Sequence, residues 1–290
     1  MTDKHNEAMI IAVHGGAGEL ASTDHAAIRS GCEAAARRGW NVLCSAGSAL
    51  DAVEAAVRAL EDDPLFNAGR GSVLRSNGSI QMDAAIMDGA AGRAGAVCGI
   101  ERIAHPISLA RAVLRDGRHV LMMGEAALAM APDMPRCTNE DLLVPEQLAR
   151  HRKVYGTVGA VALDGQGKLA AATSTGGTFG ACPGRVGDSP LIGCGTLADN
   201  QGAASATGLG EAILLAGVCR QAIMALHGQP VEQALRAGLA ACEAIWPTAP
   251  CGLLLVDKNG HVAAAHNTPA MPVCWIQDGT MSSRLSTHDG

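Results

Sequence analysis

A glycine-threonine pair, Gly156-Thr157, stands at the head of an apolar, β-branched segment near the middle of the sequence. A threonine hydroxyl is a weak nucleophile until a neighbouring base takes its proton. When threonine is the first residue of a chain, its own α-amine can be that base, because an α-amine has a pKa of about 7.7–8.0. Thr157 is internal, so this chemistry requires cleavage after Gly156, whose flexible backbone can open its carbonyl to the hydroxyl. On these two residues alone, the start of an ordinary strand is the better interpretation.

The elements that must position this pair follow a pattern of strands and helices that both halves of the sequence share. Thr157 begins a hairpin over residues 157–175, with "DGQGK" as its turn. Ser48 and Asp51 have the spacing of a helix cap before the second of two helices. The other expected elements are a strand within 9–18, helices within 22–62, a hairpin over 71–89 that turns at Asn77-Gly78, a strand over 95–103, helices over 105–117 and 124–133, a linker with one short helix over 132–153, a strand leading into a long helix over 204–226, a helix over 230–246 and a hairpin over 251–268.

The composition and these elements together predict a layered α/β fold. Hydrophobic residues make up 48% of the chain and aromatic residues only 2%, so the core must consist mainly of small and aliphatic side chains. The helices are amphipathic, and the strands are apolar on both faces. This pattern is typical of sheets that are buried between other layers. We therefore expect a sandwich with helices outside two stacked sheets.

Charge, cysteines and glycine motifs exclude several classes of function. The net charge is −6 and no basic run is long, which argues against a nucleic-acid partner. No apolar run reaches about 18 residues without a charge, and the N-terminus does not look like a secretory signal, so we expect no membrane span and a cytoplasmic location. The ten cysteines form no CxxC pair, which favours core residues in a reducing compartment over a metal site. No dinucleotide or P-loop motif has its required flanks, so no organic cofactor is expected.

Eight short motifs are specific when their order and spacing are taken together. They are "HGGAG" at 14–18, "LEDDPLFNAGRGSV" at 60–73, "MDAAIMDG" at 82–89, "GAVCGI" at 95–100, "GTVGAVALD" at 156–164, "AATSTGG" at 171–177, "PGRVGDSPLIGCG" at 183–195 and "SATGLGEA" at 205–212. With them, most of the chain resembles the plant-type L-asparaginase and isoaspartyl peptidase family of N-terminal nucleophile (Ntn) hydrolases.

This resemblance implies a fold, a maturation step and a reaction. The fold would be a four-layer αββα sandwich, with residues 1–290 as one Ntn-hydrolase domain. Autocatalytic cleavage would divide the chain into an α subunit, 1–156, and a β subunit, 157–290. Two such pairs would form a heterotetramer, a dimer of αβ heterodimers, to which the apolar helices about Ala112 and Ala216 could supply interfaces. The mature enzyme would hydrolyse β-aspartyl dipeptides and L-asparagine.

The resemblance also implies roles for individual residues. Thr157 would be the nucleophile, and Thr175 would orient it by a hydroxyl hydrogen bond. Asn67 would hydrogen-bond near the hydroxyl and amine of Thr157. Thr207 and Gly208 would form the oxyanion hole, where donors act on charge that appears in the transition state.

A second set of residues would bind the substrate. Arg185 would hold the α-carboxylate of the aspartyl group through its planar fork of donors, and Asp188 would pair with the α-ammonium. The glycines around them and Pro190 indicate a fixed turn, which suits a pocket better than a surface ion pair. Gly210 would help the substrate to fit.

The resemblance also implies a structural sodium ion, bound by backbone carbonyls in the loop that follows the second helix. The carbonyl donors would come from Leu60, Glu61, Asp63, Phe66, Ala68 and Arg70. His14, although it lies beside two glycines, is interpreted as packing near the active site, because the threonine amine would already serve as the base.

Other functions stay open at this point. A glycosylasparaginase-like amidase usually has Asp before its nucleophile and a secretory signal, and the threonine endopeptidase branch normally has a much longer linker. A third alternative is an uncleaved, non-catalytic protein that binds an amino acid or a partner. Two features depart from the family pattern: a short segment before Thr157, and Cys251 with Pro269-Ala270 on the side where the leaving group would lie.

Overall fold

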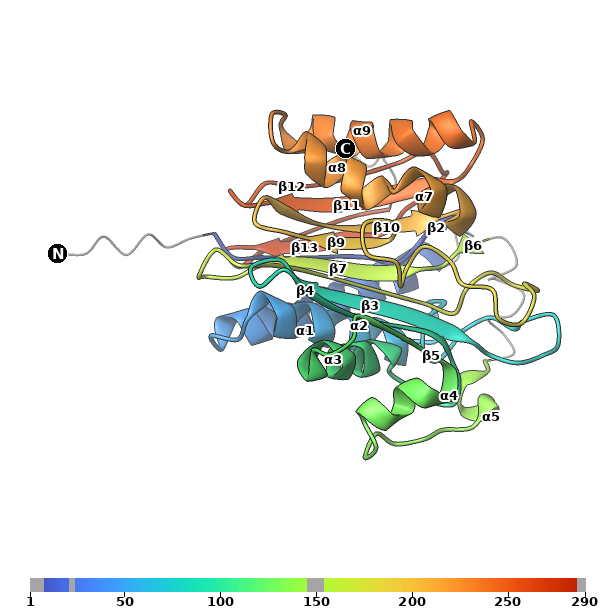
Figure 1. Cartoon of the computed structure of the whole chain (residues 1–290). Helices are drawn as coiled ribbons and strands as arrows, with labels where there is room; N and C mark the ends of the chain where they lie inside the picture. The colour runs from blue at the N-terminus through green and yellow to red at the C-terminus, as the bar shows by residue number, and fades with distance from the viewer. Residues whose placement is uncertain (1–7, 21–23, 145–153, 286–290) are drawn as a thin grey trace.

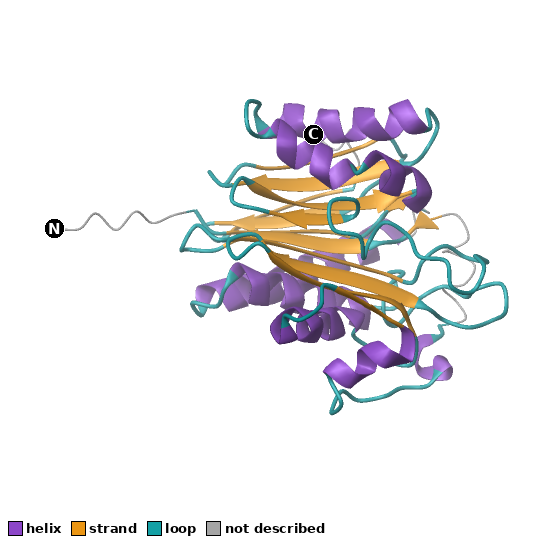
Figure 2. Cartoon of the chain, in the orientation of Figure 1, coloured by secondary structure: helices purple, strands orange, loops and turns teal. Residues whose placement is uncertain are grey.

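The protein forms four layers, with two stacked sheets between two layers of helices (Figures 1 and 2). The computed structural model describes residues 8–20, 24–144 and 154–285. The larger sheet contains, in spatial order, β14 (Thr280–Arg284), β13 (Val273–Gln277), β1 (Ile10–His14), β7 (Val158–Leu163), β8 (Leu169–Thr175), β3 (Met82–Asp88), β4 (Arg93–Ile100) and β5 (Leu121–Met123). The smaller sheet contains β12 (Val262–His266), β11 (Cys251–Asp257), β10 (Gly202–Gly208) and β9 (Thr196–Ala198). This arrangement is the αββα sandwich of the Ntn hydrolases.

Each sheet has its own helical layer on its outer face. The larger sheet is covered by α1 (His25–Cys44), α2 (Ala49–Asp62) and α3 (Pro106–Asp116), beside which lie the short α4 (Gly124–Ala127), η2 (Leu128–Met130) and α5 (Asn139–Leu142). The smaller sheet is covered by α7 (Gly210–Ala216), α8 (Val218–Ala225) and α9 (Val231–Ile245). Separate apolar clusters fill the space beneath each helical layer and the space between the sheets.

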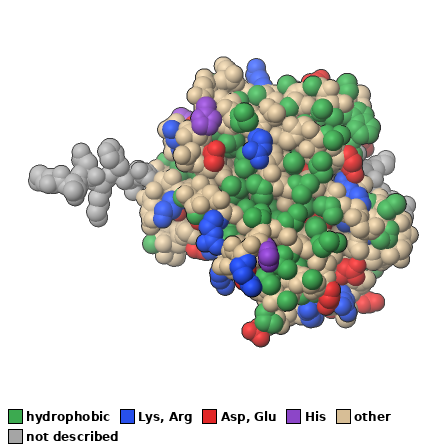
Figure 3. Space-filling view, in the orientation of Figure 1, with side chains coloured by type: hydrophobic (Ala, Val, Ile, Leu, Met, Phe, Trp, Pro, Cys, Tyr) green, Lys and Arg blue, Asp and Glu red, His purple; other side chains and the backbone are tan. Residues whose placement is uncertain are grey.

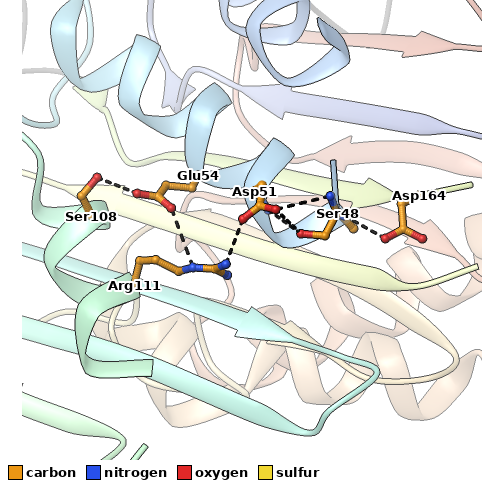
Figure 4. A network of polar contacts seen from close by, with 7 residues as sticks. Ser48, Asp51, Glu54, Ser108, Arg111 and Asp164 are labelled. Atoms are coloured by element: carbon orange, nitrogen blue, oxygen red, sulfur yellow. Dashed lines mark hydrogen bonds and ion pairs between the residues drawn. The ribbon is translucent and has the colours of Figure 1, made fainter. Parts of the chain in front are cut away.

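The start of α2 is fixed to the end of β7 by a polar network (Figure 4). Ser48 accepts the backbone N–H of Asp51 at 3.2 Å, and Asp51 accepts the backbone N–H of Ser48 in return, which confirms the expected capping box. Asp164, directly after β7, accepts the next free N–H, that of Ala49, at 3.0 Å. On the other side Arg111 of α3 pairs with Asp51 at 2.8 Å. These contacts hold α2 and α3 in place under the larger sheet, next to the strand that follows Thr157.

The hairpin of β7 and β8 forms as the sequence predicts. Asp164 closes its turn by accepting the backbone N–H groups of Gln166 at 2.9 Å and Lys168 at 3.0 Å. Val158 pairs with Ser174 in the antiparallel register, so Thr157 lies beside Thr175 at the open end of the hairpin.

The expected hairpin over 71–89 is wrong. A turn does form, since Arg75 N–H donates to Ser79 O at 2.8 Å, but no strand precedes it. Instead, β3 pairs with β4 and with β8. Arg75 is buried and hydrogen-bonds through its guanidinium to the carbonyl of Gln81, so this segment folds back as a loop rather than as a strand.

The long helix expected within 204–226 is also wrong. Gly217 has φ +63° and ends α7 in a left-handed conformation, after which α8 starts in a new direction. Five short strands, β5, β6 (Val154–Tyr155), β9, β13 and β14, were not expected; β6 pairs with β2 (Ala17–Gly18) in a separate two-stranded sheet. Of the linker over 132–153, α5 is the short helix that the sequence predicts, while residues 145–153 lie outside the described residues.

The surface combines apolar and charged side chains. On the face shown in Figure 3, hydrophobic side chains reach the surface across the middle of the molecule, and charged side chains lie mostly toward its edges. The exposed large hydrophobic side chains of the described residues are Val120, Leu121, Met123, Leu215, Met224, Ile245 and Trp246. Within the same residues, no helix is long and apolar enough to cross a bilayer.

Candidate active site

The space between the two sheets changes from apolar to polar along the strands. Successive side chains of a strand alternate between faces, so residues 157, 159, 161 and 163 of the β7 segment all face the smaller sheet. At one end, Val161 and Leu163 pack in the apolar cluster between the sheets. At the other end, Thr157 and Thr175 face the smaller sheet together. The polar end of this space is the candidate active site.

Thr157 lies directly before β7 and is only 7% exposed. Its hydroxyl donates to Thr175 Oγ1 at 3.1 Å. Thr175 Oγ1 also accepts the backbone N–H of Gly177 at 3.0 Å. The hydroxyl of Thr157 is therefore held in one orientation by a side chain whose own position is fixed by the backbone that follows β8.

Asn67 lies on the other side of Thr157, in the loop after α2. Its side-chain Nδ2 donates to Gly177 O at 2.7 Å, and its side-chain Oδ1 accepts the backbone N–H of Val73 at 3.0 Å. Its backbone carbonyl accepts the N–H of Gly176 at 2.8 Å. A Cβ atom at Gly156 would lie 2.5 Å from Asn67 Cβ, so the loop packs tightly against the proposed cleavage site. In this uncleaved chain Asn67 hydrogen-bonds to the loops around Thr157. The sequence predicts a hydrogen bond near the hydroxyl and amine of Thr157, and that amine would exist only after cleavage.

Thr207 and Gly208 come from the smaller sheet, at the end of β10. Thr207 is fully buried and pairs with Gly252 of β11. Gly208 has φ +135°, and a Cβ atom there would overlap Pro250 O, so this position requires glycine. The structure thus places the two proposed oxyanion donors on the sheet that faces Thr157.

Arg185, Asp188 and Gly210 converge at the start of α7. A Cβ atom at Gly210 would lie 2.6 Å from Arg185 Nη2 and 2.9 Å from Asp188 Oδ1, so glycine leaves room for both side chains. Asp188 is 3% exposed, and burial raises its pKa to about 7. Its Oδ2 has no hydrogen-bond partner among the described residues, which leaves an acceptor for an incoming ammonium group.

Glu211 is a member of this group that the sequence interpretation missed. Arg185 donates to it through Nε at 2.9 Å and Nη2 at 2.8 Å, a bidentate pair that occupies one edge of the guanidinium. The signal was present, because Glu211 follows the glycines of "GLGEA" at the first turn of a helix.

Two further buried charges lie behind the site. Asp83 pairs with Thr175 in the register of β3 and β8, accepts Gly99 N–H at 2.8 Å and has an Oδ2 atom without a partner among the described residues. Arg75 is 2% exposed, and a Cβ atom at Gly177 would lie 2.8 Å from its Nη1. Burial raises the pKa of Asp83, and Arg75 opposes that shift. A charge within an apolar strand such as "MDAAIMDG" is the signal that could have identified Asp83.

His14 does not have the properties of a general base. It is fully buried, and burial lowers its pKa to about 3, so the imidazole stays neutral in the range where enzymes work. This agrees with the interpretation of "HGGAG" as packing near the active site.

Known proteins resemble this chain over nearly its whole length. The asparaginase family model matches residues 7–149 and 133–285. The chain belongs to the asparaginase family. An isoaspartyl peptidase/L-asparaginase from Bos taurus is 42% identical over 97% of both chains, and that of Homo sapiens is 40% identical over 97% of both. A plant-type L-asparaginase from Pyrococcus furiosus is 40% identical over 93% of this chain and 96% of its own length. As a member of the asparaginase family, this protein is an amide-hydrolysing enzyme.

Proposed function

We propose that this protein is an autoprocessing isoaspartyl peptidase and L-asparaginase in which Thr157 becomes an N-terminal nucleophile. The observation that carries the proposal is the hydroxyl of Thr157, buried at the polar end of the space between the sheets and 3.1 Å from Thr175 Oγ1. The names of the relatives, which include isoaspartyl peptidase/L-asparaginase and plant-type L-asparaginase, support the substrate class.

Maturation would begin with Thr157 as an internal residue. Its oxygen attacks the carbonyl carbon of Gly156, the C–N bond breaks, and the released nitrogen takes the proton to become an α-amine. Water then hydrolyses the ester that joins Gly156 to the threonine oxygen. The products are residues 1–156 and 157–290, which together remain one Ntn-hydrolase domain. This step creates the base that turnover needs.

Turnover would use the same oxygen. The α-amine takes the hydroxyl proton, and Thr157 Oγ1 attacks the side-chain carbonyl of the β-aspartyl group. Thr207 Oγ1–H and Gly208 N–H donate to the oxyanion, and removing one such donor costs roughly 3–4 kcal/mol of transition-state stabilisation. The C–N bond breaks, ammonia or an amino acid leaves with the proton, and water hydrolyses the acyl-enzyme to release aspartate.

Arg185 and Asp188 would select the aspartyl group. Asp188 Oδ2 accepts from the α-ammonium, and Arg185 donates to the α-carboxylate. Because Glu211 already binds two nitrogens of Arg185, the carboxylate either uses the remaining Nη1 edge or displaces Glu211. Gly210 keeps the space between these side chains open.

The loop after α2 would hold a structural sodium ion. It closes on itself where Arg70 N–H donates to Glu61 O at 2.8 Å and Phe66 N–H donates to Asp63 O at 3.1 Å. Among the described residues, the backbone carbonyls of Phe66, Ala68 and Arg70 accept no hydrogen bond from a backbone N–H in the turns and loops. Carbonyl oxygens are suitable ligands for a hard cation. No group of His, Cys, Asp and Glu side chains that could hold a metal ion is found among the same described residues, and the backbone-carbonyl ligands proposed here rest on the resemblance to the family.

The assembly would be a dimer of αβ heterodimers in the cytoplasm. Two apolar surfaces could be covered in it, the edge strand β5 with Val120, Leu121 and Met123, and the outer side of α7–α8 with Leu215 and Met224. The second includes the helix about Ala216 that the sequence indicates. The helix about Ala112 has no comparably exposed large apolar side chain among the described residues.

Intact mass spectrometry of the purified protein tests the proposal, beside Thr157→Ala as the matched control. We expect wild type to give two masses that meet at Gly156/Thr157 and the control to give one. The processed enzyme should then release aspartate from β-aspartyl dipeptides and L-asparagine. A full-length wild-type mass that persists would instead support an uncleaved binding protein. Hydrolysis of glycan-linked asparagine alone would favour the glycosylasparaginase alternative.

A further inference from the structure

A second polar layer lies directly behind the proposed catalytic one. In the larger sheet Gly159 of β7 pairs with His14 of β1 on one side and with Thr173 of β8 on the other. Ser205 projects from β10 of the smaller sheet toward the same place. His14, Thr173 and Ser205 are each fully buried. Buried polar side chains are normally hydrogen-bonded, so the hydrogen bonds of these three residues indicate the role of the layer.

Ser205 connects the two strands that flank Gly159. Its hydroxyl lies 2.8 Å from His14 Nε2 and 2.8 Å from Thr173 Oγ1. Thr173 also donates to Gly195 O at 3.2 Å. A Cβ atom at Gly159 would overlap Ser205 Oγ and lie 2.5 Å from His14 Nε2, so the absent side chain of Gly159 is what admits the serine. Ser205 therefore crosses from one sheet to the other and bonds to both neighbours of β7.

The neutral imidazole gives this chain of hydrogen bonds a direction. Nδ1 of His14 has no hydrogen-bond partner within the usual distance and angle limits among the described residues. The backbone of Thr157 nevertheless lies close enough to raise the pKa of the His14 ring, in opposition to burial. An acceptor has that effect on a base, and the only backbone acceptor of Thr157 is its carbonyl. We assign the proton to Nδ1, facing that carbonyl, which leaves Nε2 to accept from Ser205. Ser205 in turn accepts the single hydroxyl proton of Thr173, which Thr173 shares with the carbonyl of Gly195.

On β7, β8 and β10, each residue of this layer lies two positions from a residue of the catalytic layer, on the same face of the strand. Gly159 lies two residues after Thr157, and on β8 Thr173 lies two residues before Thr175. Ser205 likewise lies two residues before the proposed oxyanion donor, Thr207. Because the nucleophile and the oxyanion donors belong to different sheets, the spacing between the sheets at this point decides whether they align.

We propose that His14, Ser205 and Thr173 form a clamp that positions Thr157 between the two sheets, acting on both self-cleavage and turnover. This rests on the proposed function, in which Thr157 becomes a free chain end. A chain end has no preceding residue to hold it. The first anchored contacts of the β subunit would then be those around Gly159 and the Thr157 carbonyl. These three side chains are positioning residues, since none of them contacts the reacting atoms.

The test compares Thr173→Val with Thr173→Ser. Valine keeps the shape of threonine and removes the hydroxyl, whereas serine keeps the hydroxyl and removes the methyl group. We expect Thr173→Val to lower kcat and the self-cleavage rate by between about 10- and 100-fold, since small misplacements of a reacting group have effects of that size. KM should change less than about twofold, because Arg185 and Asp188 are untouched. Thr173→Ser should restore kcat to near the wild-type value.

Two further variants keep the test decisive. If Thr173→Val does not fold, Ser205→Ala removes the central hydroxyl instead, and it should lower kcat with the same small change in KM. Ser174→Ala removes a hydroxyl from the opposite face of β8 and should leave kcat unchanged. Wild-type kcat in Thr173→Val or Ser205→Ala, or a rise in KM alone, would overturn the clamp and leave the function intact. A wild-type chain that never cleaves would overturn the proposed function, and the clamp with it.

Discussion

The two faces of β8 are both buried and both carry hydroxyl groups, but their surroundings differ. Toward the smaller sheet, Thr173 and Thr175 lie in a row of polar groups that leads to Thr157. Toward the helices, Ser174 donates to Glu61 Oε1 at 2.6 Å, and the same oxygen accepts the backbone N–H of Ile107 at 3.0 Å. The helix-side face therefore joins the end of α2, the sheet and the start of α3.

The comparison shows that burial of polar groups does not by itself mark a reactive site. Burial raises the pKa of Glu61 to about 8 and that of Asp188 to about 7, so both carboxyls are strongly perturbed. Glu61 lies under the sheet, where its Oε1 accepts from Ser174 and Ile107, although its Oε2, like Asp188 Oδ2, has no partner among the described residues. Asp188 lies beside Arg185 and Gly210, where groups from several elements converge. Convergence on a shared space, rather than the size of the shift, separates the two.

The largest difference between the two faces is expected from removing the Thr175 hydroxyl. Thr175→Val takes away the group that accepts from Thr157 Oγ1–H, so the nucleophile loses its fixed orientation. We expect kcat and self-cleavage to fall by about 100-fold. Steady-state kinetics and intact mass measure the two effects, with Thr175→Ser as the control that keeps the hydroxyl. Activity equal to wild type in Thr175→Val would mean that the two faces do not differ in this way.

An intermediate effect is expected from the pH dependence of ligand binding. Asp188 must be ionised to pair with an α-ammonium, and its pKa of about 7 means that it becomes protonated as pH falls below 7. The inhibition constant of L-aspartate, which binds without proton transfer to the threonine amine, should therefore weaken by up to about tenfold per pH unit below 7. Asp188→Asn should bind L-aspartate weakly at every pH. An inhibition constant that stays flat from pH 5 to 8 in wild type would contradict the role of Asp188.

The smallest effect on activity is expected from Glu61→Gln, which should change stability instead. A folded-state pKa of about 8, above the ordinary value of 4.5, means that the native protein binds more protons than the unfolded chain between these pH values. The free energy of unfolding contributed by Glu61 therefore falls as pH rises from 4.5 to 8.

Glu61→Gln keeps the acceptor that serves Ser174 and removes this titration. Its Tm should approach that of wild type at pH 5 and exceed it at pH 8, by about 2–4 °C for each kcal/mol of difference. Thermal unfolding at several pH values measures this, and kcat at pH 8 should equal that of wild type. A loss of kcat without a change in Tm would place Glu61 with the catalytic face.

Local patterns in the sequence predicted much of the fold. The β7–β8 hairpin and the capping box at Ser48 were predictable because their determinants lie within a few residues of one another. The turn at Asn77-Gly78 suggested a hairpin that does not form. The segment before the turn is a loop that contains the buried Arg75, and β3 pairs instead with β4 and β8. The break at Gly217 escaped because a glycine in an apolar helical pattern can be either tolerated or used to end the helix.

The sequence by itself determined the family, the layered architecture and the residue types of the candidate site, because the motifs that carry them are short and ordered along the chain. Only the tertiary structure decided which of these residues meet. Thr157 and Thr207 lie on different sheets, Glu211 occupies the guanidinium of Arg185, and Ser205 enters the space that Gly159 leaves. Such contacts depend on strand register and on the spacing between sheets, which are set by packing between segments far apart in the sequence.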